Sequence, residues 1–572
     1  MLTGIAASDG IAIGKVLLLK KEIPVITRTV ISDSQIKSNI KVLEDAIEKS
    51  IFQLKNIQYD SDPEMIKILD SHIMMLEDIE LVNEIRLKIE EGKQDAVSAT
   101  DETLRFFADM FRGMKNEYIK ERSEDITDIG YRLIMNMLGR EIHSLRSINE
   151  PVIIVAHDIT PSDTAQMKKN LVLGFLTDIG GRTSHAAIMA RSLEIPAILG
   201  LGNITSLVNH ADTLCFDGSE GTVIINPDHD TIQKYSEKNL QLQKEKDLLC
   251  IFKDRSSVSA DGRKVQICAN IGNPSDANKA DEYGAEGIGL YRTEFLYMDR
   301  TGFPSEDEQF EAYKIVLQTM GKRPVIIRTL DIGGDKNLPY LKIPQETNPF
   351  LGYRAMRIFL DRPEIFKVQL RALLRASVYG KLRIMYPMIS CVEEVRAANL
   401  ILEECRQELD KEGIKYCSEF EKGIMIEIPS AAIAADLIAD EVDFFSIGTN
   451  DLIQYTCAVD RMNEKIAGLY NPFNPAVLRL IKNVIDVAHD NGIWCGVCGE
   501  TAGDSRLIPL YLGMGLDEFS MSASSMLRAR KLISGLSYEK MQWMSQEVLK
   551  IKTSDDIKSF IATHCIPESP VY

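Results

Sequence analysis

One histidine lies where a side chain could accept a phosphoryl group. His185 follows the turn Gly180–Gly181 and the hydroxyl residues Thr183 and Ser184, either of which can cap the helix-forming stretch after it. Free N–H groups and the dipole at a helix start favour an arriving phosphate, and they bias the imidazole toward its neutral, nucleophilic form. The pattern predicts a phosphoryl-carrying nucleophile, although His185 taken alone could also be a capping residue.

Three arginines could bind a small, multiply charged anion. They are Arg292 in Tyr291-Arg-Thr-Glu294, Arg328 in Ile327-Arg-Thr-Leu330, and Arg461. The planar guanidinium grips phosphate and carboxylate with two hydrogen bonds. Any one of them alone could equally make a surface ion pair. Two lie in apolar strand-like runs, where an unpaired charge is costly, and this favours an anion-binding role.

Two carboxylates follow neighbouring apolar runs and could hold a hard cation. Glu427 lies in Met425-Ile-Glu-Ile-Pro429, and Asp451 follows Asn450 in Ile447-Gly-Thr-Asn-Asp451. With substrate oxygens and water, their oxygens could complete the octahedron that Mg²⁺ requires. Asp451 considered alone could equally be a helix N-cap.

Cys498 belongs to the motif Cys495-Gly-Val-Cys498. Neither a second Cys-x-x-Cys nor a nearby histidine pair completes a zinc site. A buried, inert thiol is the usual fate of cysteine. The position of Cys498 at the end of a predicted strand favours a proton donor, and the pair with Cys495 raises the hypothesis of a disulfide that switches activity off.

Strand-like and helix-like segments alternate from residue 261 onward. Eight such units in about 300 residues predict a (β/α)₈ barrel, whose active site must lie at the carboxyl ends of its strands. The polar residues above lie just at or past those ends. The predicted strands are Val265–Ile271, Gly287–Arg292, Val325–Leu330, Leu382–Tyr386, Ile424–Ile428, Phe444–Ile447, Ile493–Cys498 and Glu518–Met521.

The pattern of residue types changes twice in the first part of the chain. Short β-rich runs before residue 20 and between Pro151 and Pro227 predict one α/β domain, residues 1–22 and 144–227. Between them, residues 23–143 have helical spacing of apolar residues and predict an inserted bundle of about four helices. A charged segment, residues 228–260, predicts a connecting helix before the barrel of residues 261–572. The fold class is therefore α/β and multidomain.

Bulk composition excludes several classes of protein. The 572 residues carry a formal charge of −18, which argues against nucleic-acid binding. Apolar runs stay below the ~18 residues that span a bilayer, and the start does not resemble a signal peptide, so we expect no membrane insertion. The ten scattered cysteines suit reduced thiols in a cytoplasmic protein.

Four motifs together resemble the phosphoenolpyruvate-utilising enzyme family, and the similarity runs the whole length of the chain. They are Gly180-Gly-Arg-Thr-Ser-His-Ala-Ala-Ile188, Thr329-Leu-Asp-Ile-Gly-Gly-Asp-Lys336, Asn348-Pro-Phe-Leu-Gly-Tyr-Arg354, and residues 444–454 with Arg461.

The resemblance implies that His185 takes its phosphoryl group from phosphoenolpyruvate, releasing pyruvate, and passes it to a histidine-containing phosphocarrier protein at the head of a sugar phosphotransferase system. It implies that the helical insertion docks this carrier, and that the barrels pair into a homodimer. The family's site residues map onto Cys498 as the proton donor to the pyruvate enolate, Glu427 and Asp451 as ligands of Mg²⁺, and Arg292, Arg328, Asn450, Asp451 and Arg461 as contacts to phosphoenolpyruvate.

Two alternatives remain at this point. An ATP-linked dikinase or synthase relative would carry a large nucleotide-binding domain, whereas here a helical insertion is found and a Gly-x-x-x-x-Gly-Lys loop is not. A non-catalytic phosphoenolpyruvate sensor would not need His185 and Cys498 intact. Because His185 and the barrel belong to different domains, we also expect hinges near Asp228 and Asp261.

Overall fold

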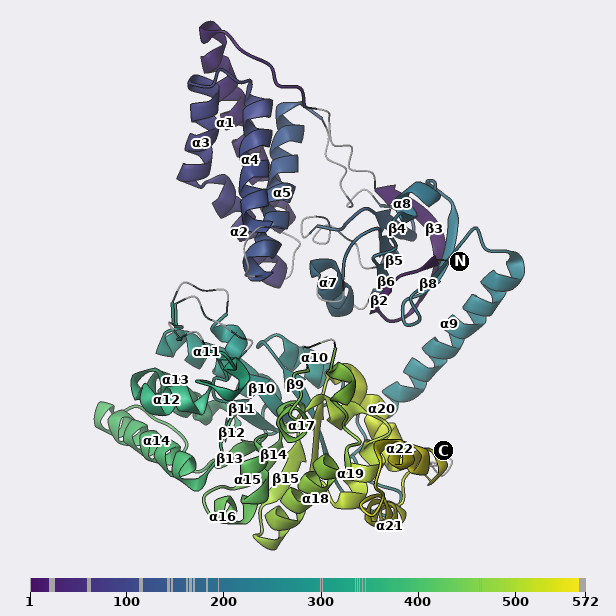
Figure 1. The fold of residues 1–572 in the computed structure, drawn as a ribbon, viewed down its shortest axis with the longest axis vertical. Helices are drawn as coiled ribbons and strands as arrows, with labels where there is room; N and C mark the ends of the chain where they lie inside the picture. Colours follow the sequence, from purple (N-terminus) through teal and green to yellow (C-terminus); the bar gives the residue numbers. More distant parts are fainter. Residues whose placement is uncertain are drawn as a thin grey trace. The chain divides into compact units, whose positions relative to one another are not determined.

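The computed structural model divides the chain into two compact units, residues 1–245 and 246–572. The division falls within α9 (His229–Cys250), the helix that we expected to connect the domains (Figure 1). The structure describes residues 2–19, 26–58, 63–112, 117–140, 145, 148–160, 163, 167, 170–181, 184–193, 195–298, 300, 302–334, 336, 338, 340–341, 343–344, 346–461, 463 and 465–564.

The first unit is built on an eight-stranded mixed sheet with the strand order β1-β8-β7-β3-β4-β5-β6-β2. Strands β3, β4, β5 and β6 are parallel neighbours, and the other pairs are antiparallel. The strands are β1 (Leu2–Thr3), β2 (Ile5–Ser8), β3 (Ile11–Leu19), β4 (Val152–Ala156), β5 (Val172–Thr177), β6 (Ala197–Leu199), β7 (Thr213–Asp217) and β8 (Thr222–Ile225).

Both faces of this sheet are covered, which explains why β4 is apolar at every position. Helix α7 (His185–Leu193) packs its alanines on one face, against Ile154 and Phe175. Helix α8 (Ile204–Leu207) packs on the other face, with Ile153. The parallel strands therefore deliver their carboxyl ends, and the loops that follow, to one edge of a two-sided core.

A helical bundle is inserted between the parallel neighbours β3 and β4. The described residues form five α-helices here, one more than the four or so predicted. Their apolar faces make two buried clusters, and Met189 of α7 belongs to one of them. The bundle helices are α1 (Ile36–Gln58), α2 (Pro63–Leu76), α3 (Ile79–Glu90), α4 (Ala96–Arg112) and α5 (Glu117–Met137).

The second unit is a closed barrel of eight parallel strands, in which the last strand, β16, pairs with the first, β9, to close it. Each predicted strand is confirmed, with ends that differ by at most three residues. The strands are β9 (Gln266–Ile271), β10 (Ile288–Arg292), β11 (Pro324–Arg328), β12 (Lys381–Tyr386), β13 (Glu421–Ile426), β14 (Phe444–Ile447), β15 (Trp494–Val497) and β16 (Glu518–Met521).

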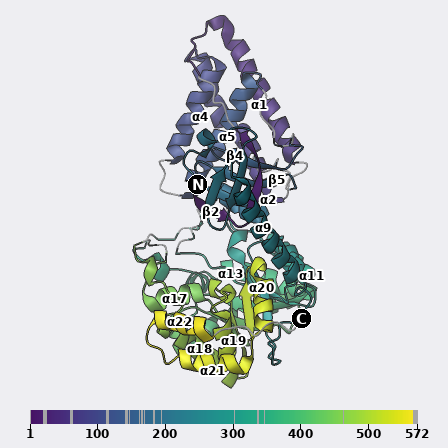
Figure 2. The same ribbon diagram turned by 90° about the vertical axis from the view of Figure 1, so that its right-hand side faces the viewer.

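Helices surround these strands (Figures 1 and 2). Alternate strand residues point outward into one large apolar layer beneath the helices, while the others fill the barrel interior. The helices are α10 (Asp276–Glu282), α11 (Glu306–Met320), α12 (Met356–Asp361), α13 (Pro363–Ala376), α14 (Val392–Glu412), α15 (Pro429–Ile433), α16 (Ala435–Ala439), α17 (Thr449–Cys457), α18 (Pro475–Asp490), α19 (Ile508–Met514), α20 (Ala523–Ser534), α21 (Tyr538–Val548) and α22 (Ser554–His564).

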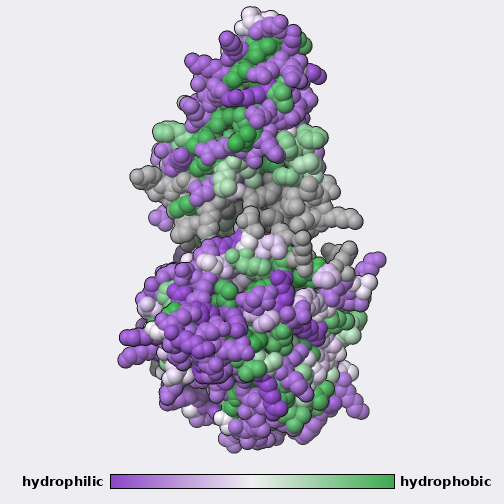
Figure 3. Space-filling model, turned by 90° about the vertical axis from the view of Figure 1, so that its left-hand side faces the viewer, coloured by the Kyte–Doolittle hydropathy of each residue, from purple (hydrophilic) through white to green (hydrophobic). Residues whose placement is uncertain are grey.

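On the face shown in Figure 3, apolar residues are interspersed with hydrophilic ones in both units. Among the described residues, none of the helices combines the length and the hydropathy that crossing a bilayer requires.

Candidate active site

A buried ion-pair network occupies the carboxyl end of the barrel. Arg328, the last residue of β11, is 5% exposed. Its Nη2 donates a hydrogen bond to Glu294 Oε1 at 2.8 Å, and its Nη1 lies 3.0 Å from Asp331 Oδ2. Lys336 Nζ also contacts Glu294 Oε1, at 2.7 Å. The strand-end position expected for Arg328 is found, but its charge is already balanced by carboxylates.

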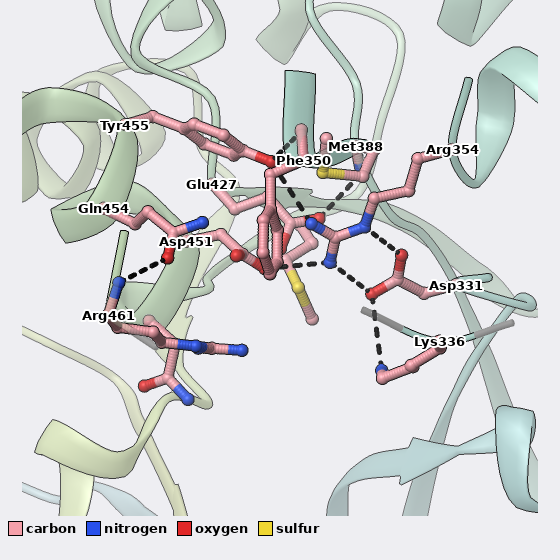
Figure 4. Close-up of polar contacts among 12 residues, drawn as sticks. Asp331, Lys336, Phe350, Arg354, Met388, Glu427, Asp451, Gln454, Tyr455 and Arg461 are labelled. Carbon is pink, nitrogen blue, oxygen red and sulfur yellow. Dashed lines mark hydrogen bonds and ion pairs between the residues drawn. The ribbon is translucent and has the colours of Figure 1, made fainter. Parts of the chain in front are cut away.

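Arg354 joins this network to Asp451 (Figure 4). Its guanidinium donates two hydrogen bonds to Asp331, at 2.8 and 2.9 Å, and one to Asp451 Oδ2 at 3.0 Å. A further bond reaches the Tyr455 hydroxyl at 3.2 Å, and that hydroxyl donates to the Phe350 carbonyl. Burial alone would raise the pKa of Asp331, but Arg354 and Arg328 outweigh it and hold the pKa well below its usual value.

Glu427 is the least compensated acid of the group. It follows β13, is 1% exposed, and accepts a hydrogen bond from the Met388 backbone N–H at 2.7 Å. Met388 adopts the left-handed backbone region, with φ of 55°. Burial and the neighbouring Asp451 and Asp331 raise the pKa of Glu427 to about 8. Without a bound cation, the site therefore disfavours the ionised form of Glu427.

The predicted metal ligands fit a hard cation. Asp451 Oδ1 is buried and has no hydrogen-bond partner among the described residues, and Glu427 lies close enough for the two charges to repel. Within the part of the chain that the structure describes, no three Asp, Glu, His or Cys side chains gather into a complete metal site. Held by Glu427 and Asp451, a cation would take its other ligands from substrate and water, as Mg²⁺ commonly does.

The other predicted binding residues surround this centre. Arg292 ends β10, pairs in register with Arg328 and is exposed, with its guanidinium 5.9 Å from the centre of the Phe295 ring. The side chain of Asn450 forms hydrogen bonds with Glu500. The Arg461 backbone N–H donates to Gln454 Oε1, and its guanidinium makes none of the contacts drawn in Figure 4. Arg292 and Arg461 are therefore more open to an anion than Arg328.

Cys498 lies in the barrel interior, just past the end of β15. Its thiol contacts the Ile447 carbonyl at 3.7 Å and is 4% exposed. Burial raises the pKa of Cys498 to about 12, despite Ser446 and Arg328, which lower it. A thiol in this environment keeps its proton at neutral pH, as a proton donor must.

Cys495 lies on the opposite face of the same strand. It belongs to the apolar layer beneath the helices, whereas Cys498 belongs to the interior cluster. Both are free thiols. Because their Cβ atoms point to opposite sides of β15, a disulfide between them would require the backbone to move. The geometry therefore gives the redox-switch hypothesis no support.

The loop before His185 follows β5, at the edge of the sheet in the first unit. Gly180 has φ of 117°, and the Ser184 hydroxyl accepts a hydrogen bond from Ala187 N–H, so Ser184 is the helix cap. Thr183, the other predicted cap, lies outside the described residues. His185 is the first residue of α7, where its position at a helix start was predicted.

Four buried or half-buried residues of the site had no role predicted from the sequence. Glu294, Asp331, Lys336 and Arg354 lie on loops after β10 and β11, and only the closed barrel brings them together. The sequence could have pointed to them. Glu294 shares a motif with the strand-end residue Arg292, and the other three belong to motifs that carry the family resemblance.

Family models match three parts of the chain. The phosphoenolpyruvate-binding domain of phosphoenolpyruvate-utilising enzymes matches residues 246–538. The amino-terminal and mobile domains of the same family match residues 3–122 and 148–221. The chain belongs to the phosphoenolpyruvate-utilising enzyme family. The family model of the phosphoenolpyruvate-binding domain spans the barrel, and that of the mobile domain spans the loop that carries His185.

Relatives in this family match nearly the full length. A protein of Staphylococcus carnosus named phosphoenolpyruvate-protein phosphotransferase is 50% identical and is aligned over 98% of each chain. Proteins with the same name from Listeria monocytogenes and Geobacillus stearothermophilus are 50% and 49% identical, with 98% of this chain covered and 98% and 97% of theirs.

Proposed function

We propose that this chain is an enzyme that transfers a phosphoryl group from phosphoenolpyruvate to its own His185, and then to the histidine-containing phosphocarrier protein that begins the sugar phosphotransferase system. The observation that carries this proposal is the 50% identity to the S. carnosus phosphotransferase over 98% of both chains. The buried ion network at the barrel's carboxyl end supports it, since a small, multiply charged anion needs such a site.

Substrate binding is assigned to the open side of the network. Arg292, which is exposed, and Arg461, which is half-buried, would hold the phosphate and carboxylate of phosphoenolpyruvate. Asn450 would join them from its place beside Glu500, to which its side chain is hydrogen-bonded. Arg328 would contribute through its remaining N–H groups, since its Nε has no hydrogen-bond partner among the described residues. Arg354 fixes Asp331 and Asp451 in place, so the site is formed before substrate arrives.

Glu427 and Asp451 would hold Mg²⁺. Asp451 Oδ1 has no hydrogen-bond partner among the described residues, so this oxygen is available as a ligand. When bound, the ion supplies positive charge that stabilises the transferring phosphoryl group. The Cys498 thiol would then give its proton to the enolate carbon, since its buried thiol stays protonated at neutral pH.

His185 belongs to the first unit and the substrate site to the second. We therefore propose a swivelling movement, with hinges near Asp228 and Asp261, at the two ends of the segment that contains α9. The helical insertion, which shares Met189 with the His185 helix in one core, would dock the carrier. We further propose that the barrels pair into a homodimer and that the enzyme works in the cytoplasm, where the described cysteines would remain free thiols.

Labelled phosphoenolpyruvate with Mg²⁺ tests this function. We expect one acid-labile, base-stable label per chain, its transfer to the carrier, and complete loss of both in His185→Gln. The matched control is His157→Gln, because His157 follows β4 at the same edge of the sheet with its imidazole 71% exposed. Labelling of His185→Gln, or its loss in His157→Gln, would contradict the assignment.

A further inference from the structure

A second buried charge cluster lies in the barrel interior, near the amino ends of the strands. Glu518, the first residue of β16, is 1% exposed, and neither carboxylate oxygen has a hydrogen-bond partner among the described residues. Arg383 is the neighbouring cation, but its Nη1 comes only to 3.9 Å of Glu518 Oε2 and its Nε is 2.8 Å from Glu421 instead. A buried carboxyl left this poorly paired needs an explanation other than packing.

Strand register connects Glu518 to the thiol of Cys498. Gly496 pairs with Ser446 on one side and with Glu518 on the other. Cys498 lies two residues beyond Gly496, so its side chain is on the same interior face, one layer closer to the substrate site. Gly496 places no side chain between Ser446 and Glu518, and the ring of Trp494 on the same strand borders that position, 3.4 Å from where a methyl group on Gly496 would lie.

Glycines keep this space open at a second position. A methyl group on Gly289 would meet Ser520 Oγ at 2.2 Å and Glu518 Oε1 at 2.5 Å, and one on Gly496 would come to 3.1 Å of Glu518 Cβ. Gly289 is thus needed to admit this carboxyl, and a side chain at Gly496 would crowd the Cβ of Glu518. The carboxyl of Glu518 therefore has a defined place in the barrel interior.

The electrostatics favour proton movement toward Cys498. Burial raises the pKa of Glu518 to about 7, although Arg383 and the Cys268 thiol lower it and Glu421 and Asp517 add to the rise. Burial raises the pKa of Cys498 to about 12, and Ser446 is the first of the neighbours that lower it. A protonated Glu518 is therefore a much stronger acid than the Cys498 thiol above it.

We propose that Glu518 restores the proton of Cys498 after each turnover, with the Ser446 hydroxyl, a buried group that like the Glu518 carboxylate has no hydrogen-bond partner among the described residues, as the link between them. This inference rests on the proposed function, in which the Cys498 S–H bond breaks as the enolate forms its C–H bond. The Glu518 O–H bond then breaks, the proton passes through the hydroxyl, and the S–H bond forms again. Water at the amino end, where the Glu421 side chain is 32% exposed, returns a proton to Glu518.

Rapid-quench measurement of pyruvate tests the relay in the full-length enzyme with Mg²⁺, phosphoenolpyruvate and excess carrier. In Glu518→Gln we expect the first equivalent of pyruvate at the wild-type rate, because Cys498 starts protonated. Steady-state turnover should then be at least about tenfold slower, equivalent to ~1.4 kcal/mol. A purely structural role would slow both phases together or neither.

Two further variants keep the result decisive. Ser446→Ala should show the same fast first turnover and slow steady state, and it carries the test alone if Glu518→Gln does not fold. Cys268→Ala removes a thiol that lowers the pKa of Glu518 but lies off the row of Ser446 and Gly496, and this variant should turn over at the wild-type rate. Unchanged steady states in both Glu518→Gln and Ser446→Ala, or a slowed first turnover, would overturn the relay alone. Absence of pyruvate from the wild type would overturn the proposed function as well.

Discussion

The two ends of the barrel interior both bury charged side chains, yet they treat them differently. At the carboxyl end, Arg354 and Arg328 are surrounded by carboxylates at 2.8–3.0 Å. At the amino end, Arg383 is paired with the half-exposed Glu421, and Glu518 has only a distant contact at 3.9 Å. Carboxylates that are buried to the same extent therefore have close cations at one end and a distant one at the other.

The difference shows what decides the charge of a buried carboxyl. Close cations hold the pKa of Asp331 well below its usual value, although burial opposes this. Without such a partner, burial raises the pKa of Glu518 to about 7. Paired carboxyls serve as fixed anions, whereas an unpaired one near neutrality can exchange its proton.

The largest expected effect is at the carboxyl end. Glu427→Gln removes a proposed Mg²⁺ ligand and should lower the rate of His185 labelling by about a thousandfold, equivalent to ~4 kcal/mol of barrier. Quench-flow labelling at saturating phosphoenolpyruvate measures it, and Mn²⁺ titration should show weakened binding. The surface variant Glu364→Gln, with a side chain 66% exposed, is the control and should label normally. A normal rate in Glu427→Gln would remove Glu427 from the site.

Removing the arginine at each end should cost different amounts of stability. Arg354→Met leaves Asp451 without its close cation and Asp331 with Arg328 as its close one, and should lower the free energy of unfolding by about 3–5 kcal/mol. Arg383→Met should cost about 2 kcal/mol, because Glu518 can take up a proton and Glu421 reaches solvent. Urea unfolding at pH 7 measures both. Equal losses would break the contrast between the two ends.

The pH dependence of stability should identify Glu518. Its pKa is raised from 4.5 to about 7 by folding, so the native state binds more protons between these values. Its contribution is full below pH 4.5 and is lost as pH rises through 7, a total of about 3 kcal/mol. Comparison of wild type with Glu518→Gln in urea unfolding at pH 5.5 and 8 should show that the variant loses less. An identical loss would mean that Glu518 does not titrate there.

The smallest effect is expected at Cys495. Because it faces the helices and Cys498 faces the interior, Cys495→Ser should leave the rate of peroxide inactivation within about twofold of wild type. Thiol counting after peroxide should show no paired loss of two thiols. Strong protection of the serine variant would revive the disulfide hypothesis.

Much of the fold could be predicted because local pattern and hydrogen bonding agree. Runs such as Val325–Ile327 are buried on both faces of the barrel wall, so they are apolar without interruption and read clearly as strands. The bundle was harder to count, since a helical period continues through the short breaks between consecutive helices. The described residues of the bundle form five α-helices, where about four were predicted.

The site could be predicted only in part. Arg328, Glu427, Asp451 and Cys498 end or follow strands, and a parallel barrel must bring such positions to one edge. Arg354 lies 26 residues beyond Arg328 on a loop, and nothing local shows that it reaches both Asp331 and Asp451. The sequence shows Glu518 as a charged residue at the start of an apolar strand, but it does not show that the carboxyl lacks a close partner.

The amino-acid sequence by itself determined the order of the elements, the strand ends that carry polar groups, and the glycine turn before His185. These follow from period, turn residues and the chemistry of single side chains. Tertiary structure alone decided which charges are paired, which face of β15 each cysteine takes, and which carboxyl stands alone. Partners come from different strands and loops, and a pKa depends on those neighbours rather than on the residue's own segment.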